Sequence, residues 1–84
     1  AAQFGARALT HALAQELRPR GVHVALLVAD GVIQTERNPM EGRPPAESLS
    51  AEDVAAAVAY LASQTPRGWT HELVVTPSGD VWTP

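Results

Sequence analysis

One short stretch in the first half of the chain limits the possible folds more than any other. Residues 22–28 read Val-His-Val-Ala-Leu-Leu-Val, so six of the seven are apolar, and glycines stand close by at positions 21 and 31. A short, β-branched, apolar run bounded by glycine predicts a strand that is buried on both faces. Strands of this kind belong to parallel sheets covered by helices, so we expect an α/β fold.

The residues that follow this strand are the first place to look for a binding site. In open α/β sheets, ligands bind in the crevice beyond the carboxyl ends of the strands. Asp30 and Gly31 stand at that end of the predicted strand. A plain turn from strand to loop is the alternative interpretation of the same two residues.

Two helices and a second strand complete the predicted order of elements. Apolar residues recur at three- and four-residue spacing over residues 4–18, which predicts a helix. Ser50, with Asp53 three residues later, is typical of a helix N-cap, so a second helix is expected over 51–63. Residues 69–75 form a second strand candidate. The order helix, strand, loop, helix, strand predicts a right-handed crossover between two parallel strands.

The first helix is expected to bury one stripe and expose the other side. Its stripe towards the core consists of apolar residues, namely Phe4, Ala8, Leu9, Ala12, Leu13 and Leu17. Its polar side carries Arg7, His11 and Arg18.

Residues 34–49 separate the first strand from the second helix. They contain three prolines and mixed charges without any periodicity, which indicates a loop. A long loop in a compact domain is usually a lid over a site or a disordered segment, and both interpretations remain open.

The size of the chain raises a further expectation. Its 84 residues allow one domain at most. Two helices and two strands cannot cover both faces of the sheet that these apolar runs require. The sequence also starts at Ala1, without a cap before the first helix. We therefore expect residues 1–84 to be the C-terminal piece of a longer domain, with a processed or engineered terminus as the alternative.

Composition excludes several classes of function. The net charge is −3 and no basic patch is visible, which argues against nucleic acid as a partner. No run approaches the ~18 apolar residues of a membrane span, and no signal peptide is visible. The chain has no cysteine, which excludes thiol chemistry and fits a cytoplasmic location.

The histidines do not suggest a metal site. His11, His23 and His71 fall on three predicted elements, without a pair at i, i+4 spacing or a cysteine partner. Ser78, His71 and Asp30 could be drawn as a hydrolase triad, but the Gly-x-Ser-x-Gly elbow is absent. We therefore expect neither a metal centre nor a serine nucleophile.

Three segments together resemble the short-chain dehydrogenase/reductase family. They are Ala-Gln-Glu-Leu-Arg-Pro-Arg-Gly-Val-His-Val at 14–24, Gly-Val-Ile-Gln-Thr at 31–35 and Trp-Thr-His-Glu-Leu at 69–73. The resemblance covers essentially the whole chain and corresponds to about the last third of a typical member. It implies the C-terminal part of a Rossmann-like, doubly wound parallel sheet. The family's Gly-rich phosphate turn, catalytic Ser and catalytic Tyr would all lie outside this chain.

The resemblance also implies a cofactor site. By this match, Asp30, Gly31, Val32, Ile33 and Thr35 would lie against the nicotinamide end of NAD or NADP. Gly31 would allow the backbone to come close to the cofactor. The backbone of Ile33 would meet the carboxamide, and Thr35 would hydrogen-bond to the carboxamide or the pyrophosphate.

Gln3 departs from the family pattern. It falls where the family has the Lys of its Tyr-x-x-x-Lys motif. That Lys binds the nicotinamide ribose, and its charge lowers the pKa of the Tyr by Coulomb attraction. Gln can hydrogen-bond to a ribose but cannot supply a charge. No catalytic residue is therefore assigned in this chain. Gln at this position predicts a slow or inactive parent protein, and a match shifted by one or two residues at this end is the alternative.

Two functional hypotheses follow. In the first, the parent protein transfers a hydride between NAD(P) and the carbonyl or alcohol of an unidentified small-molecule substrate, covered by the loop 34–49, and this segment alone is inactive. In the second, the chain is a non-enzymatic packing module that forms a homo-oligomer through helix 4–18, or a truncated product without function.

Overall fold

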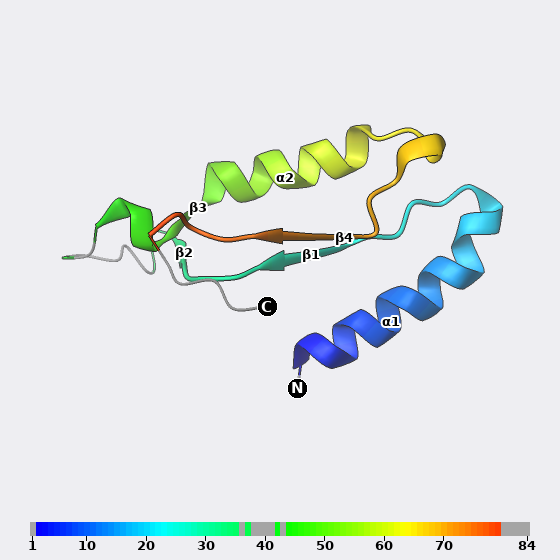
Figure 1. Cartoon of the computed structure of the whole chain (residues 1–84), viewed down its shortest axis with the longest axis horizontal. Helices are drawn as coiled ribbons and strands as arrows, with labels where there is room; N and C mark the ends of the chain where they lie inside the picture. Colours follow the sequence, from blue (N-terminus) through cyan, green and yellow to red (C-terminus); the bar gives the residue numbers. More distant parts are fainter. Residues whose placement is uncertain (1, 36, 38–41, 43, 80–84) are drawn as a thin grey trace.

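The chain folds into two helices and four strands in the computed structural model, which describes residues 2–35, 37, 42 and 44–79 (Figure 1). The two α-helices are α1 (Ala2–Leu17) and α2 (Ala51–Ser63). Short 3-10 turns occupy η1 (Arg18–Arg20), η2 (Pro45–Glu47) and η3 (Pro66–Gly68). The strands are β1 (Leu26–Ala29), β2 (Ile33–Gln34), β3 (Leu49–Ser50) and β4 (Glu72–Val75).

The strands β1 and β4 run parallel and side by side, which confirms the predicted α/β class with parallel strands. Their register pairs Leu26 with Glu72 and Ala29 with Val75. A backbone hydrogen bond extends the pairing at each of its two ends. The N–H of Leu26 donates to the carbonyl of His71 over 2.9 Å, and the N–H of Asp30 donates to that of Val75 over 2.8 Å.

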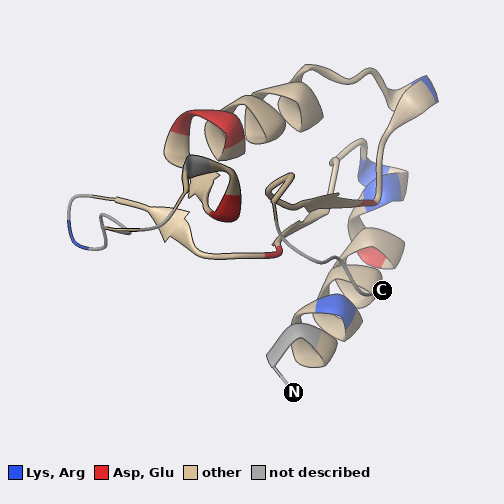
Figure 2. Ribbon diagram, turned by 60° about the vertical axis from the view of Figure 1, so that its left-hand side comes forward, with Lys and Arg blue, Asp and Glu red and all other residues tan. Residues whose placement is uncertain are grey.

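The two helices lie on opposite faces of this strand pair, as Figures 1 and 2 both show. Leu27 of β1 lines a hollow together with Val58 and Leu61 of α2. Glu72 of β4 instead meets Arg7 of α1. Successive residues of a strand point to opposite faces, so adjacent register positions serve different helices.

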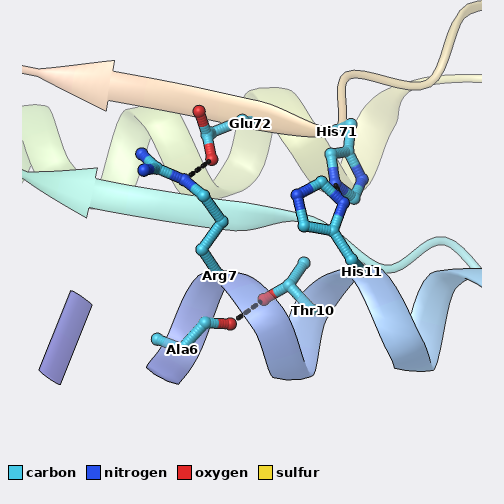
Figure 3. Close-up of polar contacts among 6 residues, drawn as sticks. All are labelled: Ala6, Arg7, Thr10, His11, His71 and Glu72. Carbon is cyan, nitrogen blue, oxygen red and sulfur yellow. Dashed lines mark hydrogen bonds and ion pairs between the residues drawn. The ribbon is translucent and has the colours of Figure 1, made fainter. Parts of the chain in front are cut away.

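The face that α1 turns to the sheet differs from the prediction. The most covered positions are Thr10, Ala14, Arg7 and Leu17, whereas Phe4 and Leu9 are 74% and 61% exposed. Thr10 is accommodated because its hydroxyl donates to the carbonyl of Ala6 over 2.7 Å (Figure 3). The predicted burial of the stripe is therefore wrong: its members Phe4, Ala8, Leu9, Ala12 and Leu13 are exposed.

Both long strands begin later than predicted, and the side chains around Thr70 explain why. The imidazole of His23 stacks on Trp69 with a centroid distance of 4.9 Å, and its Nε2 meets the Thr70 carbonyl at 2.9 Å. The Thr70 N–H donates to Oε1 of Gln64 over 2.8 Å. Since side chains bond both backbone groups of Thr70, the ladder starts only at the next residues, and β1 begins at Leu26 instead of 22.

The remaining bounds differ little. Helix α1 covers Ala2–Leu17 instead of 4–18, while α2 covers the predicted residues. The predicted loop 34–49 contains regular structure that was not predicted: the 3-10 turn η2, the end of β2 and the start of β3, with β2 and β3 paired in parallel. Residues 36, 38–41 and 43 lie outside the described residues, so the lid remains a prediction.

The buried core is small. Among the residues with assigned exposures, the buried apolar ones are Ala14, Leu49, Leu61 and Pro77. All four residues of β1 are only half-buried, so the predicted burial of this strand on both faces is not seen. Two helices over two strands supply too few side chains to cover such a strand. None of the described helices has the length and apolar character needed to cross a bilayer.

A cap at the start of α2 leads to a stability prediction. The Asp53 N–H donates to Oγ of Ser50 over 3.0 Å, and that hydroxyl donates to the Asp53 carboxylate over 2.6 Å. We expect Ser50→Ala to lower the free energy of unfolding by about 1 kcal/mol, because a helix N–H loses its partner. Denaturant unfolding followed by circular dichroism measures this change.

Ser63→Ala is the matched control for this cap. The Ser63 hydroxyl donates to the Tyr60 carbonyl in the exposed last turn of the same helix. We expect a change within about 0.5 kcal/mol. Equal losses for the two variants would contradict the capping role of Ser50.

Candidate functional site

The candidate site lies where β1 and β4 end. Parallel strands bring their carboxyl ends to one edge, and those of β1 and β4 lie side by side (Figure 1). The residues after β1 therefore lie beside those after β4, with Gly31 against Pro77. The bond from the Asp30 N–H to the Val75 carbonyl holds the two segments together. The carboxyl-end edge, where ligands bind in open α/β sheets, is therefore built from two segments far apart in the sequence.

Gly31 packs its backbone directly against a proline ring. Its φ of +145° lies in a region that residues with side chains rarely adopt. A Cβ at this position would lie 3.0 Å from Cδ of Pro77 and 3.7 Å from Cδ1 of Leu49. Conformation and space both require glycine here, and this exposes the backbone of the loop.

The next residues continue as β2 and dock on Leu49. The Leu49 N–H donates to the carbonyl of Val32 over 2.9 Å, and Ile33 pairs with Leu49 in the register. In a parallel pair, one residue of each register pair forms its hydrogen bonds to the residues on either side of its partner. Here that residue is Leu49, so the N–H and C=O of its partner Ile33 are not used by β3. Ile33 therefore turns one donor and one acceptor away from β3.

The sequence-predicted residues thus form one continuous backbone segment. Asp30 and Ile33 are half-buried, while Gly31, Val32 and Thr35 are exposed. Gln3 lies in the first turn of α1, and its side chain is outside the described structure. Helix α1 runs opposite to β1, so this turn lies towards the carboxyl end of the strands rather than the amino end (Figure 1).

A neighbouring cleft of about 470 Å³ was not predicted from the sequence. Its described lining consists of residues from the β3–α2 junction and the segment after β4, among them Ser48, Asp53, Thr76, Pro77 and Ser78. Residues 30–35 are not part of that lining. The rule that ligands bind beyond the carboxyl ends of strands was applied to the first strand, where it indicates Asp30. Applied to the second strand, the same rule indicates Thr76 and Pro77.

Several acidic residues lie at this end of the molecule, next to a loop that also carries a basic residue (Figure 2). Glu52 and Asp53 stand in the first turn of α2, Glu47 in η2 and Asp30 after β1. This charge disfavours a phosphate group and favours a neutral or cationic one. Among the described residues, no cluster of three His, Asp or Glu side chains could hold a metal ion.

The chain is similar to part of a known dehydrogenase. The chain is 32% identical to the farnesol dehydrogenase of Aedes aegypti over 84 aligned residues. The alignment covers 95% of this chain and 34% of that protein, so the chain spans about a third of the length of the curated relative it matches. No family model matches the chain. No solved structure matches it either.

The close approach at Gly31 gives a second prediction. We expect Gly31→Ala to lower the free energy of unfolding by about 1–3 kcal/mol, because the new Cβ strains the backbone and pushes on Pro77. Denaturant unfolding measures the loss, and the amide resonances of Asp30 and Thr76 should shift.

Gly68→Ala is the control for this variant. A Cβ at Gly68 meets nothing within 4 Å, and this glycine has no positive φ. We expect it to be neutral or slightly stabilising. An unchanged stability of Gly31→Ala would contradict the described packing.

Proposed function

We propose that this chain is the C-terminal segment of a short-chain dehydrogenase/reductase. The whole protein would transfer a hydride between NAD or NADP and the carbonyl or alcohol of a small molecule. The observation that carries the proposal is the backbone segment 30–35 at the carboxyl edge of a parallel strand pair, with Gly31 held against Pro77. The similarity to part of a dehydrogenase supports it independently.

Ile33 offers what a nicotinamide carboxamide needs. A carboxamide has one carbonyl acceptor and one amino donor, and Ile33 turns its N–H and C=O away from β3. The acidic surroundings suit the nicotinamide end of a dinucleotide better than its pyrophosphate. When bound, the cofactor supplies or accepts the hydride. The chain's own residues orient the ring through the backbone of residues 31–33.

The open edge of β1 favours a larger sheet. The amides of Leu26 and Asp30 bond towards β4, so by alternation those of Leu27 and Ala29 point to the opposite edge. No described strand pairs with that edge. Strands contributed by the rest of the domain would pair there and bury the half-exposed β1.

A packing module is the second candidate function. The outward stripe of α1 favours it, because Phe4 and Leu9 are largely exposed and Leu13 is 38% exposed. Such a module would form a homo-oligomer of the isolated chain through α1. Sedimentation of the chain and of Leu9→Glu separates the candidates. A dimer that Leu9→Glu dissociates supports the packing module. A monomeric chain would instead mean that the exposed stripe of α1 packs against the rest of the domain in the whole protein.

The isolated chain should not turn over NADH or NADPH. The resemblance puts the catalytic Ser and Tyr of the family outside this chain, and Gln3 carries no charge. We expect no oxidation of either cofactor above background with farnesal, the aldehyde of the relative's named substrate. Robust turnover by the chain alone would overturn the assignment of the missing parts.

The coding sequence upstream of Ala1 gives the complementary test. A Gly-rich turn and a Tyr four residues before Gln3 are expected there. In the whole protein, Gln3→Lys should raise kcat about tenfold or more, because a cation beside the Tyr favours its ionised form. Gln15→Lys, at the far end of the same helix, is the matched control and should not change kcat. Equal effects of the two substitutions would contradict the role assigned to position 3.

A further inference from the structure

Three side chains join the end of α1 to the start of β4, away from the candidate site. Arg18 Nη2 lies 3.0 Å from Nδ1 of His71, and Nε2 of His71 lies 3.0 Å from Nδ1 of His11. Figure 3 shows the two imidazoles facing each other across the helix and the strand, and their centroids are 4.7 Å apart. Arg18, His71 and His11 line a hollow of about 580 Å³ with Gln15 and Pro19.

The permanent charge of Arg18 fixes the direction of both hydrogen bonds among Arg18, His71 and His11. A guanidinium only donates, so Nδ1 of His71 must accept and the proton of the neutral ring is on Nε2. That Nε2–H then donates to Nδ1 of His11, which places the second proton on Nε2 of His11. Both neutral rings are thereby held in one tautomer. The same assignment argues against a metal between them, because Nε2 of His71 has no free lone pair.

We propose that Arg18, His71 and His11 form a proton-operated latch that holds α1 to β4 while both imidazoles are neutral and opens when either takes up a proton. A proton on His71 would occupy Nδ1 and face the Arg18 guanidinium at 3.0 Å. A proton on His11 would occupy Nδ1 and face the N–H of His71 at 3.0 Å. In both cases an acceptor becomes a donor, and the hydrogen bond is replaced by repulsion. Histidine is the side chain that changes charge near neutral pH.

Arg7 and Glu72 are the charged neighbours of the latch, and the Glu72 carboxylate attracts a positive charge on either imidazole. Arg7 of α1 donates from Nε to the Glu72 carboxylate of β4 over 2.7 Å (Figure 3). The hydrogen bond from Arg7 is the largest influence and lowers the pKa of Glu72; burial opposes it, and the charges of Arg7, His11 and His71 lower the pKa further. Glu72 therefore stays ionised and paired with Arg7 near neutral pH. We expect α1 to remain tied at Arg7 and to separate near Arg18.

His23 provides an internal control within the same chain. Its Nε2 meets the carbonyl of Thr70 at 2.9 Å, and a carbonyl only accepts. The ring donates this bond whether it is neutral or protonated. Protonation should thus leave the contact between His23 and Thr70 intact and break the latch.

Nitrogen-detected NMR of the imidazole rings in the 84-residue chain tests the latch. At about pH 8 we expect His11 and His71 to carry their proton on Nε2 alone, and at about pH 5 both rings to be doubly protonated. Over that interval the amide resonances of residues 11–18 and of His71 should shift together, and that of Thr70 should not. Arg18→Gln should abolish most of this concerted shift, whereas Arg20→Gln, in the same turn, should preserve it.

Three results would overturn the latch. They are a proton on Nδ1 of His71 at about pH 8, an acid response that Arg18→Gln leaves unchanged, and the absence of a fixed tautomer on either ring at about pH 8. The last result is also the one expected if α1 does not pack against β4 in the isolated chain. The latch does not depend on the proposed enzymatic function, because none of these measurements involves a cofactor.

Discussion

The parallel pairing of β1 with β4 is the constraint on which the rest of the structure depends. It joins residues 26–29 to residues 72–75, more than half the chain apart, through backbone bonds at both ends. Because the strands are parallel, the connection between them must cross over, and α2 makes that crossing on one face. The other face is left to α1. The carboxyl ends then meet at one edge, where Gly31 and Pro77 pack together, and the start of β4 lies near the latch residues.

Local sequence signals predicted the elements but not their limits. The apolar run at 22–28 and the Ser50 cap indicate a strand and a helix, and both form. The first four residues of that run stay outside the ladder, because His23 and Gln64 bond the backbone of Thr70 instead. The stripe of α1 was read correctly as apolar but placed on the wrong face. The periodicity of apolar residues indicates that a helix has an apolar side, but it does not indicate which segment of the protein packs against that side.

The candidate site shows the same division between local and long-range information. Gly31 could be singled out because a glycine after a buried strand has a local meaning. Pro77 and Leu49, which hold it, come from segments 46 and 18 residues away in the chain, and nothing in their spacing links them to Gly31. The pairing of His11 with His71 likewise joins a helix to a strand 60 residues later. Contacts of this kind follow from topology and were not visible in the sequence.

Amide hydrogen exchange along β1 tests the parallel pairing most directly. With β4 as its described partner, the N–H groups of Leu26 and Asp30 donate to His71 and Val75. They should exchange slowly, whereas those of Leu27 and Ala29, which point to the opposite edge, should exchange rapidly in the isolated chain. Uniform protection, or protection of Leu27 and Ala29 instead, would mean that β1 is paired differently and that Gly31 does not lie where the proposed cofactor site requires it.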